Sequence, residues 1–416
     1  MSTLPYRSFR HLAEQFGPIM LLKFCEVPVI VVSSPEIAKQ ILKDNDPNFA
    51  ERSESIVTKI MWYNSISIAF SPYGDYWRQM RKICAMELLS AKNVRSFGSI
   101  RNDEVSGLIK SIQLSSGKPI NLTEMIFALL SSITCRAAFG KVCKDSDALI
   151  ELMKEASRMA SGFQIADLFP SSKILNTLSW GKLRLVMMRR KLDVILDDII
   201  NEHKENLANM SKENGDIAKM GNGEFGNEDL VDVFLRVEES GELEFPIGND
   251  NIKAVLFDMF SAGTETSSTT IDWTMAELMR NPRVMTKAQA EVRQVFKGSK
   301  IIKENDVQKL KYLKLGSQVL TNPDDFEPER FENNDVDFVG SDFQYIPFGT
   351  GKRICPGMTF GLASVELPLA QLLYSFNWKL LEGVKPEDLD MIENPGVTAA
   401  RKDNLIVVPT SYESLV

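Results

Sequence analysis

One cysteine of this chain stands in a segment whose residue types suit metal binding. Residues 348–357 read FGTGKRICPG, and the three glycines of this segment let the backbone turn tightly and let a flat molecule approach. The proline after Cys355, Pro356, predicts a helix start. A sulfur at a helix N-terminus beside Lys352 and Arg353 favours the thiolate, which is the metal-binding form. We therefore expect Cys355 to present an anionic sulfur that suits an axial metal ligand.

Other roles for Cys355 were weighed on the same residues. A free cysteine is usually a small buried hydrophobic residue, and taken alone Cys355 would be assigned that role. A zinc or iron–sulfur site requires several sulfur or histidine ligands, whereas the nearest other cysteine in the sequence is Cys143. The GTGK in the segment lacks the spacing of a phosphate-binding loop.

The whole segment resembles the haem-binding loop of the cytochrome P450 family, F-x-x-G-x-R-x-C-x-G, and matches it at every fixed position. The resemblance implies haem b (iron protoporphyrin IX) as the cofactor and Cys355 as the axial ligand of the haem iron. It also implies cofactor contacts from Phe348, Gly351, Arg353 and Gly357.

A long helix predicted over residues 252–280 carries an unusual polar stretch, FSAGTETSSTT. Taken alone, the stretch reads as a polar face with a tolerated kink, because glycine and hydroxyl residues weaken a helix. Beside the Cys355 segment it resembles the family's distal helix, A-G-x-[DE]-T, matched by Ala262, Gly263, Glu265 and Thr266. The resemblance implies that a flat cofactor leaves little room for a side chain at Gly263, that the helix opens locally, and that Glu265 and Thr266 relay protons.

Two further motifs, each less specific, match motifs of the same family. Trp77 and Arg81 form W-x-x-x-R, which alone indicates an ordinary amphipathic helix and by resemblance supplies an indole N–H and a guanidinium to the haem propionates. Residues 328–331 read PERF, another family signature. Several longer stretches, such as FSPYGDYWRQMRKIC, resemble the plant microsomal branch that acts on terpenoids and similar lipophiles.

Candidate substrate-pocket residues are apolar or small, apart from one acid. They comprise the segment 60–70, the distal-helix residues Asp258, Ser261 and Ala262, and Val397 in the turn 396–398. This composition predicts a lipophilic small-molecule substrate.

Composition limits the possible roles of the 416-residue chain. Its net charge of −8 argues against a nucleic-acid partner. Five scattered cysteines do not make a disulfide framework, which indicates a reducing compartment. The two histidines, His11 and His203, lie in charged stretches and are predicted to be solvated. No run of eighteen apolar residues occurs, so we expect no membrane-spanning helix and a soluble or peripheral chain.

The remaining pattern predicts a mainly α protein with small β-sheets, organised as one domain over residues 1–416. We expect a hairpin over residues 19–32, a helix from Ser34 to about Asp44, and an Asn121-capped helix to Phe139. A long helix is predicted over 183–210, followed by a flexible connector over 211–228. Pro368 should kink the helix after Cys355.

The chain departs from the family pattern after Leu315. Relatives continue there into a helix that bears E-x-x-R, whereas here GSQVLTNPDDFEPERF follows almost at once. The E-x-x-R matches at 155–158 and 277–280 lie upstream of the proper place. We therefore expect an internal segment to be missing, the P450 fold to be incomplete in that region, and Arg330 to lack its usual partners. The family's N-terminal membrane anchor is also absent.

Together the motifs predict a haem-dependent monooxygenase that inserts one atom of O₂ into a lipophilic, terpenoid-like molecule. The resemblance implies electrons from an NADPH–cytochrome reductase. Local charge, set against an acidic whole, predicts that an acidic reductase surface docks on a basic patch of Arg78, Lys82 and Lys352. A solvated surface is the alternative for that patch. The resemblance also implies a monomer at the cytosolic face of the endoplasmic reticulum membrane. The missing segment leaves an alternative function open, namely a non-catalytic remnant that binds haem poorly or not at all.

Overall fold

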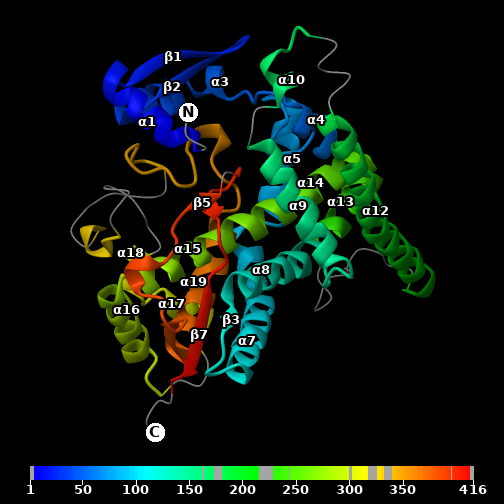
Figure 1. Ribbon diagram of the computed structural model, residues 1–416. Helices are drawn as coiled ribbons and strands as arrows, with labels where there is room; N and C mark the ends of the chain where they lie inside the picture. The colour runs from blue at the N-terminus through cyan, green and yellow to red at the C-terminus, as the bar shows by residue number, and fades with distance from the viewer. Residues whose placement is uncertain are drawn as a thin grey trace.

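The structure is a computed structural model. It describes residues 4–161, 164–172, 180–214, 228–241, 243–298, 302–316, 326–331, 340–394 and 396–412. Across these ranges the chain is mainly helical, with three small antiparallel sheets, as the sequence predicts. Figure 1 shows the hairpin of the N-terminal part at one end of the molecule and the strand β7 near the other.

The α-helices of the described part are α1 (Pro5–Phe16), α2 (Pro35–Lys39), α3 (Asp46–Phe49), α4 (Ile56–Met61), α5 (Asp75–Glu87), α6 (Ala91–Ser96), α7 (Gly98–Leu114), α8 (Leu122–Phe139), α9 (Ser146–Ala160), α10 (Ile165–Leu168), α12 (Trp180–Asn214), α13 (Leu230–Ser240), α14 (Asn249–Ser261), α15 (Ser267–Arg280), α16 (Pro282–Val295), α17 (Glu304–Val307), α18 (Lys311–Gly316) and α19 (Met358–Ser375). Two π-helical segments are η1 (Gln40–Asp44) and η4 (Ala262–Thr266). The 3₁₀ turns are η5 (Pro328–Phe331), η6 (Gly351–Arg353) and η7 (Pro386–Asp388).

The strands form three separate sheets. They are β1 (Ile19–Phe24) with β2 (Val27–Val32), β3 (Ile120–Asn121) and β4 (Phe376–Leu380) on either side of β7 (Ile406–Ser411), and β5 (Glu393–Asn394) with β6 (Ala400–Arg401). In the hairpin, Ile19 pairs with Val32, and Cys25 in the connecting turn has φ 55°. The predicted hairpin is therefore confirmed.

The predicted helix caps form as expected. The Ser34 hydroxyl accepts from the Ile37 N–H at 3.2 Å, and the Asn121 side chain accepts from the Glu124 N–H at 3.2 Å. Such a side-chain oxygen satisfies an N–H that the helix leaves unpaired. The helix that begins at Pro35 changes to π geometry at η1, and α19 continues through Pro368.

The central helical rod runs through the hydrophobic core, with α14, η4 and α15 in line (Figure 1). It begins at Asn249, three residues before the predicted start, and it packs against α8 and α19. Two clusters of buried apolar side chains enclose it, and Leu89 and Phe97 pack against both. The core is therefore continuous around the rod.

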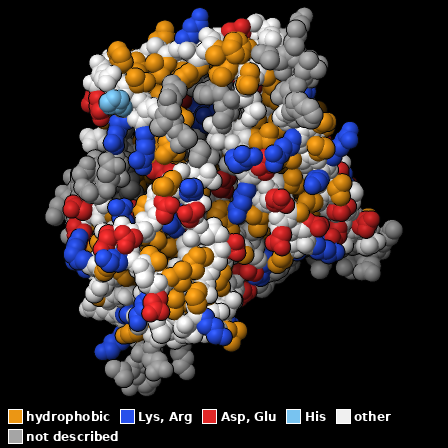
Figure 2. All heavy atoms as spheres, viewed as in Figure 1, with side chains coloured by type: hydrophobic (Ala, Val, Ile, Leu, Met, Phe, Trp, Pro, Cys, Tyr) orange, Lys and Arg blue, Asp and Glu red, His pale blue; other side chains and the backbone are white. Residues whose placement is uncertain are grey.

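Helix α8 is long and apolar enough to cross a membrane by length and composition, which the sequence reading had not expected. However, 78% of it is buried inside the fold, so it serves as a core helix. Exposed apolar side chains occur elsewhere, at Ile19, Leu21 and Ile30 of the hairpin. Figure 2 shows hydrophobic side chains gathered at that end of the molecule.

His203 is buried, so its predicted solvation is wrong. Its Nε2 lies 2.9 Å from Oδ2 of Asp229, the N-cap of α13, and its Nδ1 lies 2.7 Å from the Ile199 carbonyl oxygen. The pair joins α12 to α13. The charged stretch around His203 misled the sequence reading, because one face of α12 is buried while the other is solvated. His11 is exposed, as expected.

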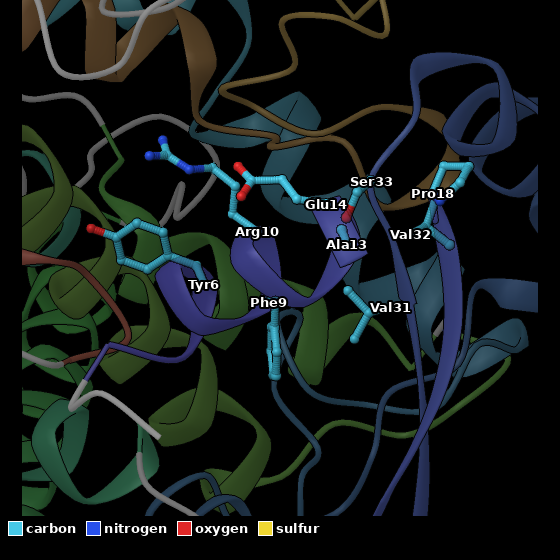
Figure 3. Close-up of a pocket in the computed structure, with 9 residues that line it drawn as sticks. All are labelled: Tyr6, Phe9, Arg10, Ala13, Glu14, Pro18, Val31, Val32 and Ser33. Atoms are coloured by element: carbon cyan, nitrogen blue, oxygen red, sulfur yellow. The ribbon is translucent and has the colours of Figure 1, made fainter. Parts of the chain in front are cut away.

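Helix α12 is longer than predicted and includes residues 211–214 of the expected connector. Most of that connector lies outside the described residues. A pocket of about 520 Å³ lies between α1 and β2 (Figure 3). It is lined by Tyr6, Phe9, Arg10, Ala13, Glu14, Pro18, Val31, Val32 and Ser33, none of which is a predicted site residue.

Candidate functional site

The turn that carries Cys355 is closed by its own backbone and by the N-terminal part of the chain. The Cys355 N–H donates to the Phe348 carbonyl oxygen at 2.8 Å. Gly351 has φ +67°, and a Cβ there would collide with the Leu42 carbonyl oxygen and lie 2.7 Å from Asp46 Oδ2. A side chain at 351 would therefore be excluded by protein alone.

The electrostatics at Cys355 differ from the expectation. Its side chain is exposed in part, and α19 begins three residues later, at Met358. The surrounding protein atoms nevertheless raise the pKa of the thiol, while the Gly357 N–H and the charge of Arg81 oppose this rise without reversing it. The predicted preference for thiolate is thus wrong for this arrangement, because desolvation disfavours the anion more than the two groups stabilise it.

Two guanidinium groups lie over the indole ring of Trp77, with Arg353 Cζ at 4.4 Å and Arg81 Cζ at 5.2 Å from the ring centroid. The Trp77 N–H donates to the Ile68 carbonyl oxygen at 3.0 Å. It is thus engaged with the protein, whereas the resemblance implies that it binds a haem propionate. Arg81 donates to the carbonyl oxygen of Ile354. The ring is therefore a platform for two cations beside Cys355.

Arg353 is fixed almost entirely by backbone carbonyls. Its guanidinium donates to Ala50 at 2.7 Å, to Ser71 at 2.7 Å and to Ile68 at 3.4 Å. Burial lowers the pKa of Arg353 to about 10 and also lowers that of Arg81. Within the described part of the chain, neither guanidinium is hydrogen-bonded to a carboxylate, although the charge of Glu51 acts on Arg353 from a greater distance.

This donor set fits the predicted cofactor. Two partly buried cations without carboxylate partners call for an anionic ligand, because desolvated charge is unfavourable unless it is compensated. Cys355 offers a sulfur at the same place, and the charges of Arg81 and Cys355 interact. A haem group, with two propionates and an iron that accepts a thiolate, satisfies both requirements.

The distal motif lies on the π-helical segment η4, which interrupts the rod. Ala262 and Thr266 are exposed, although Thr264, Ser267 and Ser268 around them are buried. One face of the rod is thus open at its middle. π-Helical turns of this kind occur mostly at functional sites. The local opening that the resemblance implies is present.

The start of α19 brings the Cys355 turn to this opening. The Phe360 ring lies 3.6 Å from the position of a Cβ on Gly263, and Ser267 Oγ lies 3.9 Å from that of a Cβ on Gly361. On its other side, Gly263 faces Thr134 of α8, where a Cβ would lie only 3.1 Å from the side chain. Close packing against Thr134 therefore disfavours a side chain at Gly263, in addition to the cofactor that the resemblance implies.

Glu265 and Thr266 point to different partners. The Thr266 hydroxyl donates to the Ala262 carbonyl oxygen at 2.6 Å. Glu265 accepts from the Ser157 hydroxyl of α9 at 2.8 Å. Burial raises the pKa of Glu265, while the Ser157 hydrogen bond and the charge of Lys154 act against the rise. The sequence does not predict Ser157 as a site residue, because no motif includes it or lies beside it in the sequence.

The structure places the predicted substrate-pocket residues in different surroundings. Asp258 is buried and accepts from the Ala69 N–H at 2.9 Å, and burial raises its pKa to about 6. It therefore anchors the segment 60–70. Ser261 Oγ is buried, with no hydrogen-bond partner in the described part of the chain, and Ala262 is exposed. Val397 is 61% exposed.

The PERF segment is held through its acid. Glu329 accepts from Arg283 and Lys287 of α16, both at 2.5 Å, and from the Tyr312 hydroxyl at 3.0 Å. The Arg283 guanidinium holds the pKa of Glu329 well below its usual range. The Arg330 side chain, which is expected to lack its usual partners, lies outside what the structure describes.

The helical fold and this sulfur-and-cation site define a haem-thiolate oxidoreductase. The family profile described as cytochrome P450 matches residues 2–315 and 317–407. The chain therefore belongs to the cytochrome P450 family, whose members use a haem-thiolate cofactor and oxidise lipophilic substrates with O₂ and a redox partner. It is a monooxygenase of this family.

The chain is similar to several plant oxygenases. Premnaspirodiene oxygenase of Hyoscyamus muticus is 49% identical, over 99% of this chain and 89% of the relative. The 5-epiaristolochene 1,3-dihydroxylase of Nicotiana tabacum is 47% identical, over 98% and 89%. A zebrafish cytochrome P450 solved with progesterone has a TM-score of 0.78 at 19% identity, covering 98% of this chain and 99% of that one, which supports the fold.

Proposed function

We propose that this chain binds haem b through Cys355 and oxidises a terpenoid-like hydrocarbon. The observation that carries the proposal is the Cys355 sulfur beside two guanidiniums, Arg81 and Arg353, that are not hydrogen-bonded to a carboxylate in the described part of the chain. The substrate class is supported by the names of the relatives, which oxidise premnaspirodiene and 5-epiaristolochene. Haem bound there would supply the activation of O₂.

The proximal residues hold the cofactor. Arg81 and Arg353 would bind the propionates, with Trp77 as the flat platform beneath them. The tight turn at Gly351, together with Phe348 and Gly357, presents the sulfur and excludes other side chains from it. The exposed face at Ala262 would lie on the opposite side of the flat group.

The distal residues handle protons. Thr266 is exposed at the opening of the rod, where its hydroxyl, now bonded to the Ala262 carbonyl oxygen, would hold or move a proton. Glu265, whose raised pKa makes proton uptake easier, would pass protons from the Ser157 side of the rod. Small residues at Ser261 and Ala262 leave room for the substrate.

The proposed partners rest on the family and on the positive charges at the surface beside Cys355. We propose an NADPH–cytochrome reductase as electron donor, with a monomeric chain at the cytosolic face of the endoplasmic reticulum membrane. Lys82 and Lys352 are exposed, and Lys352 Nζ lies 5.9 Å from the Tyr73 ring centroid, over which Arg78 also lies. These cations gather beside the Cys355 turn.

We also propose that the single P450 domain lacks an internal segment after Leu315. The proposal is supported by the alignment with premnaspirodiene oxygenase, which extends over 456 positions although this chain has 416 residues. Nothing in the described part of the chain favours the alternative of a non-catalytic remnant. Haem retention on mild heating, with and without an E-x-x-R segment inserted after Leu315, measures what the segment contributes.

The test of the proposed function is spectroscopic. Reduced protein exposed to carbon monoxide should give the Soret band specific for thiolate ligation. Cys355→Ser should abolish that band while the far-UV circular dichroism remains helical, because an alcohol of similar volume is a poor iron ligand. A thiolate band that survives in the variant, or no haem binding by the parent protein, would refute the proposal.

A further inference from the structure

Three consecutive residues other than glycine adopt left-handed backbone conformations. Tyr63, Asn64 and Ser65 have φ of 54°, 60° and 58°. Side chains disfavour this region, and such residues persist only where surrounding contacts hold them. The turn must therefore be fixed from outside.

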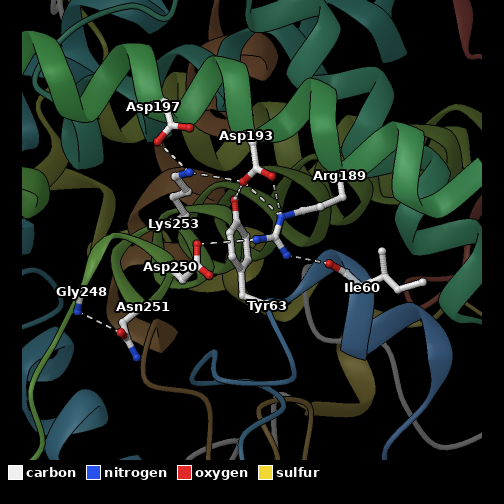
Figure 4. Close-up of polar contacts among 9 residues, drawn as sticks. All are labelled: Ile60, Tyr63, Arg189, Asp193, Asp197, Gly248, Asp250, Asn251 and Lys253. Atoms are coloured by element: carbon white, nitrogen blue, oxygen red, sulfur yellow. Dashed lines mark hydrogen bonds and ion pairs between the residues drawn. The ribbon is translucent and has the colours of Figure 1, made fainter.

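Helix α12 supplies the fixing contacts (Figure 4). The Tyr63 hydroxyl donates to Asp193 Oδ1 at 2.8 Å, and Arg189 Cζ lies 3.0 Å from the centroid of the Tyr63 ring. Arg189 also donates to the Ile60 carbonyl oxygen at 2.8 Å, just before the turn. Figure 4 shows both α12 side chains reaching onto the tyrosine.

The acceptor Asp193 is itself held in place. Arg189 Nε lies 3.1 Å from Asp193 Oδ1, and Lys253 Nζ of α14 lies 3.4 Å from it. Lys253 also pairs with Asp197 at 2.6 Å. Tyr63 is 2% exposed, and burial raises its pKa, so its hydroxyl stays a donor. Two helices thus clamp one buried phenol.

The backbone that leaves this turn holds the cofactor-side arginine. The Ile68 carbonyl oxygen accepts from Trp77 Nε1 at 3.0 Å and from Arg353 Nη1 at 3.4 Å, and the Ser71 carbonyl oxygen accepts from Arg353 Nη2 at 2.7 Å. Arg353 stands two residues before Cys355. The backbone of residues 63–71 therefore connects the contacts made with α12 to the carbonyls that hold Arg353.

We propose that Tyr63 is a positioning residue for Arg353. By fixing the left-handed turn against α12, the Tyr63 hydroxyl acts together with Asp258, which accepts from the Ala69 N–H, to set where the carbonyls of Ile68 and Ser71 stand. These carbonyls hold the Arg353 guanidinium in place for the anionic groups of the cofactor. The role of Arg353 toward the cofactor rests on the proposed function, whereas the path from Tyr63 to Arg353 does not.

The first experiment uses haem-free protein. Tyr63→Phe keeps the ring beneath Arg189 and removes only the hydroxyl. We expect amide hydrogen exchange of residues 66–71 to become about tenfold faster, with α8 unchanged, since local opening is governed by local contacts. The control, Tyr374→Phe, removes a hydroxyl that donates to Phe296 O at 3.2 Å, and should leave 66–71 unchanged. No acceleration, or equal acceleration in the control, would overturn the proposal.

The second experiment is a double-mutant cycle on haem transfer to excess apomyoglobin. If Tyr63→Phe speeds haem loss about fivefold and Arg353→Lys about thirtyfold, the double variant should lose haem no faster than Arg353→Lys alone, because coupled residues are not additive. A product of about 150-fold would mean independent action and overturn the proposal. A parent chain that holds no haem refutes the proposed function, and hydrogen exchange then decides the positioning role. Asp193→Asn replaces Tyr63→Phe in both experiments if that variant does not fold.

Discussion

Gly263 of the central rod packs directly against Thr134 of α8. A Cβ at position 263 would lie 3.1 Å from both Cγ2 and Oγ1 of Thr134, and the Thr134 hydroxyl is fixed by donating to the Leu130 carbonyl oxygen at 2.8 Å. This contact lies on the π-helical segment, where Ala262 and Thr266 are exposed. One glycine thus serves helix packing and the site together.

Gly263→Ala should destabilise the protein by about 1–2 kcal/mol, since a crowded methyl group forces a buried neighbour to move. In a Thr134→Ala background the same change should instead stabilise by up to about 1 kcal/mol, because alanine favours helix over glycine. Urea unfolding of the four proteins measures both effects. An equal effect of the substitution in the two backgrounds would contradict the packing explanation.

Thr266→Ala should leave haem binding intact and divert electrons to peroxide. Product formed per NADPH should fall about 100-fold, the lower end of what a positioned proton-transfer group contributes. Product and peroxide are measured together. Thr266→Ser, which keeps the hydroxyl, is the control, and coupling equal to that of the parent in Thr266→Ala would leave Thr266 as an ordinary helix residue.

The His203–Asp229 pair should make stability depend on pH. Burial opposes the charged imidazole, but Asp229, the Ile199 carbonyl oxygen and Asp232 together outweigh it, so the pKa of His203 is raised above its usual 6.5. The stabilisation is fully present below about pH 6.5 and is lost as pH rises through the folded-state pKa. His203→Gln should therefore cost about 2 kcal/mol more at pH 6 than at pH 9 in urea unfolding. The exposed His11→Gln is the control, and a cost independent of pH would count against the pair.

The contacts of Glu329 with Arg283, Lys287 and Tyr312 should make stability depend on pH in the opposite direction. The pKa of Glu329 is lowered chiefly by Arg283, so the stabilisation is present above the usual value of 4.5 and is lost as pH falls below it. Glu329→Gln should lower the free energy of unfolding by about 1 kcal/mol at pH 7, a small effect because the partners of Glu329 are partly exposed. The cost should be smaller at pH 3. Glu382→Gln, an exposed acid, is the control. The same cost at both pH values would refute the assignment.

Reversing charge at Lys82 and Lys352 together should slow reduction by the reductase about tenfold at low salt and much less at 0.5 M salt, because screening weakens exposed charges. Stopped-flow reduction under carbon monoxide measures the rate. Lys118→Glu, an exposed lysine on the turn after α7, is the control. A rate change that salt does not alter would argue for a solvated surface in place of a docking site.

The sequence by itself determined the features that depend on residues close along the chain. The hairpin at 19–32, the caps at Ser34 and Asn121, and the glycine turn before Cys355 follow from local backbone preferences. Such preferences act over a few residues and need no knowledge of the fold. The family resemblance has the same basis, because each of its motifs is a short stretch of sequence.

Tertiary structure decided which polar groups meet. Nothing near His203 in the sequence indicates Asp229, and nothing near Gly263 indicates Thr134. Arg353 is held by carbonyls, which every residue carries, so no side-chain pattern could have predicted its acceptors. The pKa of Cys355 rose instead of falling for the same reason. The desolvation of a group depends on all the atoms that the fold packs around it, and the sequence alone does not tell which atoms these are.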